Sequence, residues 1–104
     1  MGETLHLSQE NFEAAVAGKI AVLDFWAEWC GPCRMLGPVI DAVAKEVGDN
    51  VVVGKINIDE APQLVAKFGV RSVPAIFIVK DGQVINQFVG VQDRQTLLSA
   101  IKNA

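Results

Sequence analysis

Residues 20–33 of the chain read IAVLDFWAEWCGPC, and the centre of the predicted fold follows from this stretch. Residues 20–27 are apolar at nearly every position, which is typical of a strand buried on both faces of a sheet. Two cysteines follow, where a segment from about residue 32 to residue 47 begins to place apolar side chains at helical spacing. The stretch therefore predicts a buried strand, a turn that carries the cysteines, and a long helix.

Strand and helix signals alternate along the rest of the chain. Further strands are expected at residues 4–7, 51–58, 75–80 and 84–89, and further helices at residues 8–17, at residues 60–68 and after residue 93. Ser8 and Asp93 are the expected N-caps of the first and last helices. Asp81 and Gly82 form a two-residue hairpin signal. The order predicts an α/β protein with a central mixed five-stranded sheet flanked by four helices.

Length and composition restrict the possible functions. The 104 residues suit one domain, residues 1–104, and 51% hydrophobic residues supply a core without disulfide support. The net charge is −3, without a clustered basic face, so no nucleic-acid partner is expected. The start of the chain lacks a secretory signal, and the longest apolar run is too short to cross a bilayer. We therefore expect a cytoplasmic monomer without a membrane partner.

Cys30 and Cys33 are the only cysteines of the chain. Linking two residues that are three positions apart closes a very short loop and adds little stability, so the pair looks placed for chemistry. Cys30 opens the long helix, where free N–H groups and the helix dipole favour a thiolate. Cys33 lies one turn further on, and one turn separates Cα atoms by about 5–5.5 Å, which suits a disulfide.

A metal site and an inert structural disulfide are the two other uses of such a pair. Zinc takes four ligands, and besides the cysteines the chain offers one histidine, His6, far away in the sequence. Both uses are the weaker interpretations, because a CxxC pair at the junction of a strand and a helix is typical of redox chemistry. The sequence predicts no metal site and no cofactor.

The DFWAEWCGPC stretch at residues 24–33 resembles the active-site signature of the thioredoxin family, of the WCGPC type. The SVPA segment at residues 72–75 resembles the cis-proline loop of that family, and FVG at residues 88–90 resembles its third loop. The similarity covers the whole chain with these segments in the right order. It implies the thioredoxin fold.

The resemblance also implies a function, that of a general protein-disulfide reductase and electron carrier, an enzyme of the thiol–disulfide oxidoreductase class. Cys30 would be the nucleophile that attacks a disulfide of a partner protein and forms a mixed disulfide. Cys33, expected to be less accessible, would resolve this intermediate and leave the Cys30–Cys33 disulfide. A separate enzyme, thioredoxin reductase, would then return the pair to the dithiol form.

Asp24 and Lys55 are the candidate supporting residues. Asp24 lies inside the apolar run, where desolvation raises the pKa of a carboxyl. The resemblance implies that Asp24 accepts the proton of Cys33, and the alternative is an acid that only positions the backbone. The resemblance places Lys55 near Asp24, where its charge would lower the pKa of Asp24. The alternative for Lys55 is an edge or snorkelling lysine with a buried stem.

The resemblance further implies a cis peptide bond between Val73 and Pro74, in a loop that offers the Val73 backbone to an extended substrate. The alternative is a proline that simply begins a strand. A small apolar rim around Cys30 would bind partner proteins. Its expected members are Trp29, Gly31, Pro32, Val73, Pro74, Gly90 and Val91. Trp26 is expected to pack inside.

Two other functions compete with disulfide reduction. A disulfide oxidase or isomerase of the same fold is disfavoured, because oxidising relatives usually carry histidine between the cysteines, where this chain has Gly31 and Pro32. A redox-independent scaffold, or a subunit of a larger assembly, is compatible with the fold, since one fold serves many functions. The intact CxxC motif together with Asp24 and Pro74 disfavours this alternative.

Overall fold

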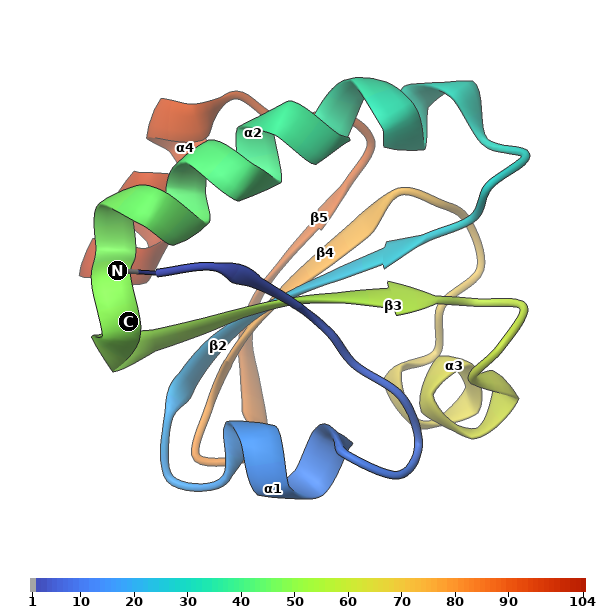
Figure 1. Cartoon of the computed structure of the whole chain (residues 1–104), viewed down its shortest axis with the longest axis horizontal. Helices are drawn as coiled ribbons and strands as arrows, with labels where there is room; N and C mark the ends of the chain where they lie inside the picture. Colours follow the sequence, from blue (N-terminus) through green and yellow to red (C-terminus); the bar gives the residue numbers. More distant parts are fainter. Residues whose placement is uncertain (1) are drawn as a thin grey trace.

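The computed structural model describes residues 2–104 as a five-stranded sheet with helices on both faces (Figure 1). The elements are β1 (Thr4–His6), α1 (Phe12–Val16), β2 (Ile20–Trp26), α2 (Gly31–Val47), the 3₁₀ turn η1 (Gly48–Asn50), β3 (Val51–Asn57), α3 (Pro62–Phe68), β4 (Ala75–Lys80), β5 (Gln83–Val89) and α4 (Arg94–Lys102). The strand order is β1-β3-β2-β4-β5. β1, β3 and β2 run parallel, and β4 and β5 add two antiparallel pairings. The predicted mixed sheet with four helices is confirmed.

Strand β2 lies at the centre of the sheet because its side chains are apolar in both directions. It pairs with β3 on one side and with β4 on the other, and its residues from Ala21 to Phe25 have no exposed surface. Leu23 and Phe25 point to one face of the sheet, while Val22 and Asp24 point to the other. The chain therefore leaves the middle of the sheet directly into the turn that carries the cysteines.

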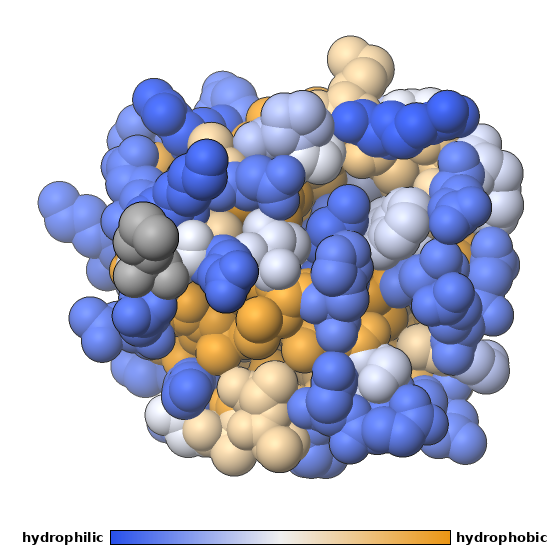
Figure 2. Space-filling view, in the orientation of Figure 1, coloured by the Kyte–Doolittle hydropathy of each residue, from blue (hydrophilic) through white to orange (hydrophobic). Residues whose placement is uncertain are grey.

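The two faces of the sheet are covered by different helices (Figure 1). Helices α1 and α3 cover one face, where the rings of Phe12, Phe25, Phe68 and Phe77 pack with centroids 5.3–5.8 Å apart. Helices α2 and α4 cover the other face with aliphatic side chains such as Leu36, Ile40 and Leu97. On the surface seen in Figure 2, hydrophilic side chains surround an apolar strip in the middle of the view, above α1.

The start of α1 corrects a prediction from the sequence. Ser8 was the expected N-cap, but the helix begins at Phe12 and Asn11 occupies the N-cap position. The Asn11 side chain accepts a hydrogen bond from the Ser8 backbone N–H and donates one to the His6 carbonyl. These two bonds hold residues 8–11 in a turn, so the helix is shorter than its periodicity indicates. Helix α3 likewise begins at Pro62 rather than residue 60, because proline suits the first helical position.

The predicted hairpin turn and the predicted cap of the last helix are confirmed. Asp81 and Gly82 have φ angles of 50° and 83°, the left-handed conformation that the tightest hairpin turns require. Asp93 is the N-cap of α4, and its Oδ1 accepts a hydrogen bond of 2.8 Å from the Thr96 backbone N–H. This bond holds the pKa of Asp93 below its ordinary value.

Candidate functional site

The two cysteines lie where the chain passes from β2 into α2. Cys30 is the N-cap residue of α2, and Cys33 lies in the first turn. They form a disulfide, with Cα atoms 5.3 Å apart, within the range expected for one helical turn. The Cys33 backbone N–H donates a hydrogen bond of 3.2 Å to the Cys30 Sγ. The helix N-terminus thus directs a donor at the Cys30 sulfur, an arrangement that stabilises a thiolate when the pair is reduced.

Both sulfur-bearing residues are buried in the disulfide form. Cys30 is 5% exposed and Cys33 is 2% exposed, so Cys33 is the less accessible residue, by a small margin. The Cys30 Sγ lies 3.7 Å from the Val73 carbonyl oxygen, whereas Gly31 and Pro32 are exposed. The Cys30 sulfur therefore faces the loop before β4, and the exposed dipeptide lies between the two cysteines.

The loop before β4 places Val73 and Pro74 beside the disulfide. The peptide bond between them is cis, the isomer that the resemblance implies. The Pro74 carbonyl accepts a hydrogen bond of 2.9 Å from the Gly90 backbone N–H, which ties the loop to the residues that follow β5. The three segments that carry the resemblance, at residues 24–33, 72–75 and 88–90, therefore meet at one end of the sheet.

The apolar rim expected around Cys30 is mostly exposed. Trp29 is 66% exposed and Val91 is 43% exposed, while Val73 and Gly90 are half-buried. Pro74 is the exception, because it is buried at the start of β4. It supports the loop, and its place in the rim stays a prediction.

Sequence reasoning missed two residues at this end of the molecule. Met35, one turn beyond Gly31 in α2, is 68% exposed. The sequence could have indicated this exposure, because Met35 lies outside the apolar face of the helix that Leu36 and Ile40 form. Asp59 accepts a hydrogen bond of 3.0 Å from Trp29 Nε1 and thereby fixes the indole. Its position just after β3 puts it at the same edge of the sheet as the cysteines.

Asp24 is fully buried in β2, on the face that α2 covers. Burial raises its pKa from the ordinary value of 3.8 to about 7, and the charge of Lys55 opposes part of that rise. Neither carboxyl oxygen has a hydrogen-bond partner among the described residues. An acid with this pKa is present in both protonation states at neutral pH, so it can take up and release a proton.

Lys55 lies in β3, directly across from Asp24 in the register of β2 and β3. Strand β3 is paired on both sides, so the interpretation of Lys55 as an edge lysine is wrong. The residue is half-buried, and its ammonium lies 4.5 Å from the centroid of the Trp26 ring. Its stem thus packs in the protein while its charge stays close to Asp24 and Trp26.

The part of the chain that the structure describes holds neither a cluster of metal ligands nor a helix suited to a membrane. Within residues 2–104, histidine, cysteine and acidic side chains nowhere form a group of three suited to a metal ion. Across the same residues, no helix combines the length and the apolar character that crossing a membrane requires.

Comparison with known proteins identifies the family. The family model for Thioredoxin matches residues 3–103. The chain is 42% identical over 91 residues to "Thioredoxin 2" of Chlorobaculum tepidum, covering 86% of this chain and 84% of that protein. It is 41% identical over 95 residues to the thioredoxin of Alicyclobacillus acidocaldarius, covering 90% of each.

Solved structures agree with this match. A mutant thioredoxin from Halobacterium salinarum superposes with a TM-score of 0.89 at 34% identity, covering 97% of this chain and 89% of that one. The thioredoxin of Malassezia sympodialis superposes with a TM-score of 0.87 at 37% identity, covering 99% of this chain and 91% of that one. With a matching fold, a matching family model and a Cys30–Cys33 pair at the start of α2, the chain belongs to the thioredoxin family and is a thiol–disulfide oxidoreductase that reduces protein disulfides by dithiol–disulfide exchange.

Proposed function

We propose that Cys30 is the nucleophile of the exchange and that Cys33 is the resolving thiol. The Cys30 thiolate attacks one sulfur of a substrate disulfide, and the other substrate sulfur leaves as a thiolate. Cys33 then loses its proton and attacks the Cys30 sulfur of the mixed disulfide. This step releases the second substrate thiol and forms the Cys30–Cys33 disulfide, so two electrons pass to the substrate.

One observation carries this division of roles, namely the hydrogen bond from the Cys33 backbone N–H to the Cys30 Sγ. It directs a helix N-terminal donor at Cys30, and a donor of this kind lowers the pKa of a thiol. Cys30 also faces the Val73 carbonyl at the mouth of the site, at 3.7 Å. Cys33 lies one turn inside the helix and is 2% exposed, which suits a thiol that meets only the mixed disulfide.

Asp24 is, in this proposal, the proton acceptor for Cys33, and Lys55 adjusts its acidity. Two properties of Asp24 support the role, its complete burial and a pKa raised by that burial to about 7. Lys55 opposes the rise and keeps part of the Asp24 population ionised at neutral pH, since an opposite charge favours the carboxylate.

Substrate proteins dock, we infer, on the apolar rim of Trp29, Gly31, Pro32, Val73, Gly90 and Val91, with buried Pro74 holding the loop in shape. The Val73 backbone is the natural partner for an extended substrate segment, because its carbonyl lies next to the Cys30 sulfur. Exposed Trp29, held by Asp59, adds a large apolar surface beside the nucleophile.

The same proposal covers the finer points of the function. The protein acts as a general reductase and electron carrier, and thioredoxin reductase resets its disulfide. Residues 1–104 form one domain that works as a monomer in the cytoplasm. The support for these points is the family, the similar length of the relatives named above, and the intact Cys-Gly-Pro-Cys motif.

The experiment that tests the function is insulin-disulfide reduction with dithiothreitol, with Cys30→Ser as the matched control. We expect the parent to accelerate insulin precipitation and Cys30→Ser to remain at the rate without protein. Equal turbidity with both proteins would contradict the activity.

The division of roles has its own test, the trapping of mixed disulfides. Cys33→Ser should accumulate substrate complexes linked through Cys30, because the resolving thiol is gone. Cys30→Ser should trap almost none, and mass spectrometry of the complexes identifies the linked residue. Linkages found mainly through Cys33 would reverse the assignment.

A further inference from the structure

Three ionisable side chains share one register across three neighbouring strands. His6 in β1 pairs with Lys55 in β3, and Lys55 pairs with Asp24 in β2. Residues paired in this way project to the same face of the sheet, here the face that α2 covers. Adjacent strands are about 4.8 Å apart, so the two ends of this His6–Lys55–Asp24 row lie about 10 Å apart. The row runs from exposed His6 through half-buried Lys55 to fully buried Asp24.

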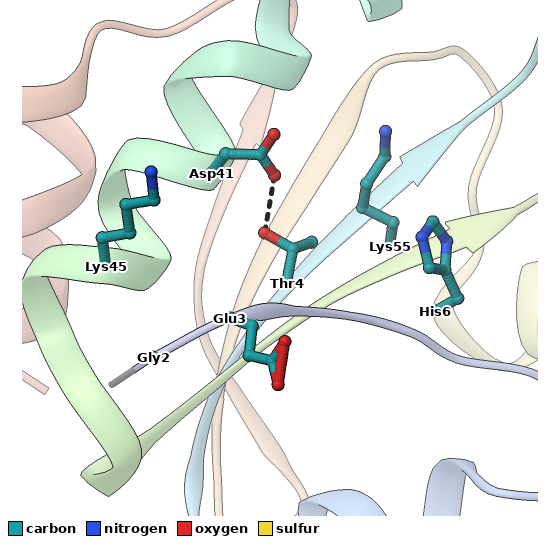
Figure 3. A pocket seen from close by; sticks show the side chains of 7 residues that line it. All are labelled: Gly2, Glu3, Thr4, His6, Asp41, Lys45 and Lys55. Carbon is teal, nitrogen blue, oxygen red and sulfur yellow. Dashed lines mark hydrogen bonds between the residues drawn. The ribbon is translucent and has the colours of Figure 1, made fainter.

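The outer end of the row opens into a pocket of about 350 Å³ between β1 and α2 (Figure 3). Its lining is formed by Gly2, Glu3, Thr4, His6, Asp41, Lys45 and Lys55. Thr4 Oγ1 donates a hydrogen bond of 2.7 Å to Asp41 Oδ1 across the pocket, joining β1 to α2. None of the rim residues around Cys30 lines it. Lys55 therefore connects this separate pocket with Asp24.

The fixed charges around His6 are evenly balanced. Glu3 comes from the residues before β1, Asp41 and Lys45 from α2, and Lys55 from β3, which makes two carboxylates and two ammonium groups. Behind Lys55, on β2, lies Asp24. Histidine is the side chain whose charge ordinarily changes between pH 5 and 8. Protonation of His6 therefore leaves the pocket with one excess positive charge, next to Lys55.

We propose that His6 is a positioning residue for the redox reaction, which adjusts the protonation of Asp24 through Lys55. His6 and Lys55 are register partners on one face of the sheet, so an imidazolium at His6 and the Lys55 ammonium repel each other. The repulsion drives the ammonium inward, toward Asp24 and Trp26, where a closer cation favours the carboxylate form of Asp24. A positive charge on His6 thus favours the carboxylate form of Asp24.

The consequence rests on the proton-accepting role of Asp24 proposed above. Asp24 must be ionised to accept the proton of Cys33, and acid removes that form. When His6 is charged, the row favours the carboxylate form of Asp24. Disulfide exchange, which needs this form, therefore extends to lower pH. The proposal therefore concerns the pH dependence of the reaction and leaves its chemistry unchanged.

The test is the titration of the Asp24 carboxyl carbon, followed by NMR in the oxidised protein with three residues at position 6. His6→Lys, which carries a fixed charge, should titrate lowest, and neutral His6→Gln should titrate highest. The direct interaction of two charges about 10 Å apart shifts a titration midpoint by about 0.3–1.2 pH units for an effective dielectric constant between that of water and about 20, and a displaced Lys55 ammonium adds to that shift. The parent should titrate between the two variants, and added salt should shrink the difference.

Two controls isolate the row. Leu5→Lys adds the same charge to β1 at a neighbouring exposed position, but Leu5 pairs with Gly54 and faces the other side of the sheet. It should leave the Asp24 midpoint nearly unchanged. In a Lys55→Gln background, the difference between His6→Lys and His6→Gln should fall to the part that the direct interaction leaves, because the residue that transmits the charge is gone.

The proposal is overturned by equal midpoints in the three proteins, by a Leu5→Lys effect as large as that of His6→Lys, or by a His6 effect that survives Lys55→Gln intact. Because the readout is the titration of Asp24 itself, it is independent of any reduction assay. Suppose that the midpoints follow the predicted order but that Asp24→Asn resolves mixed disulfides at the rate of the parent. The electrostatic coupling of the row would then be supported, and the proposed role of Asp24 as proton acceptor would be refuted.

Discussion

The two faces of the sheet are covered alike by a pair of helices, yet they are filled with different chemistry. The face under α1 and α3 holds four phenylalanine rings in mutual contact. The face under α2 and α4 is aliphatic and holds Asp24, the one buried charged or polar residue among residues 2–104. The aromatic face has no ionisable group to desolvate, whereas the other face carries a carboxyl at a penalty in stability.

This difference shows where the protein gives up stability for activity. The aromatic face gains free energy from burial alone, since ring contacts and apolar area both favour the folded state. The aliphatic face is destabilised by the same burial that raises the pKa of Asp24 to about 7. Three substitutions test this difference between the two faces.

The largest expected effect is that of Phe77→Ala, on the aromatic face. Phe77 is 2% exposed and its ring contacts those of Phe25 and Phe68, at centroid distances of 5.4 Å and 5.3 Å. Truncation of a buried phenylalanine leaves a cavity, and we expect a loss of about 4–5 kcal/mol in the free energy of unfolding. Denaturant melts measure it, with Phe77→Leu as the milder control. A loss below about 1 kcal/mol would contradict the expectation that the aromatic cluster contributes strongly to stability.

Asp24→Asn should have an effect of similar size and opposite sign. Below about pH 3.8 the carboxyl is protonated in both the folded and the unfolded state, and its titration costs nothing. Between pH 3.8 and about 7 the unfolded state loses its proton first, so the stability of the parent falls as the pH rises. The fall is complete above about pH 7.

An amide does not ionise, so the variant escapes this loss. We expect Asp24→Asn to be more stable than the parent by on the order of 4 kcal/mol at pH 8, and within about 1 kcal/mol of it at pH 4. Melts at the two pH values give both differences. Stopped-flow reduction of one protein substrate should show slower resolution of the mixed disulfide by the same variant. A variant less stable than the parent at pH 8 would show that Asp24 is a structural acid.

The smallest of the three effects is expected for Gly54→Ala, on the aromatic side of β3. A Cβ at this position would collide with the side chain of Leu7, which is itself buried. Overpacking of this kind destabilises by about 1–3 kcal/mol. Gly37→Ala is the matched control, because a Cβ at Gly37 in α2 meets nothing within 4 Å and alanine is the better helix former. Equal melting behaviour of the two variants would mean that Leu7 moves aside freely.

The elements and their order could be predicted from the sequence because periodicity and turn signals are local. Residues 20–27 had to be a central strand, and Asp81 with Gly82 had to turn, since each pattern depends on neighbouring residues alone. The start of α1 could not be predicted in this way. It is decided by the Asn11 side chain, which bonds backward to Ser8 and His6 instead of allowing the helix to begin earlier.

In the candidate site, too, the residues with local signals could be predicted and those placed by long-range contacts could not. The cysteine pair and buried Asp24 could be found because their signals lie within one stretch of sequence. The place of Lys55 between two strands depends on the pairing of β1 with β3, a long-range choice that no local pattern encodes. The hydrogen bond from Trp29 to Asp59 likewise joins residues thirty positions apart. The cis bond before Pro74 was implied only by the family resemblance, because prolines of either isomer look alike in sequence.

The arrangement of the indoles makes the site optically distinct from the rest of the molecule. The chain contains two tryptophans and no tyrosine. Trp26 packs against the cluster of Ala27 and the two cysteines, and Trp29 directly precedes Cys30. Near-ultraviolet absorption and emission above the phenylalanine range therefore arise at the disulfide end alone. Opening or closing of the disulfide, or docking of a substrate beside it, therefore changes the surroundings of both tryptophans. Loosening of the aromatic face alone leaves tryptophan fluorescence unchanged until the disturbance extends to the two indoles.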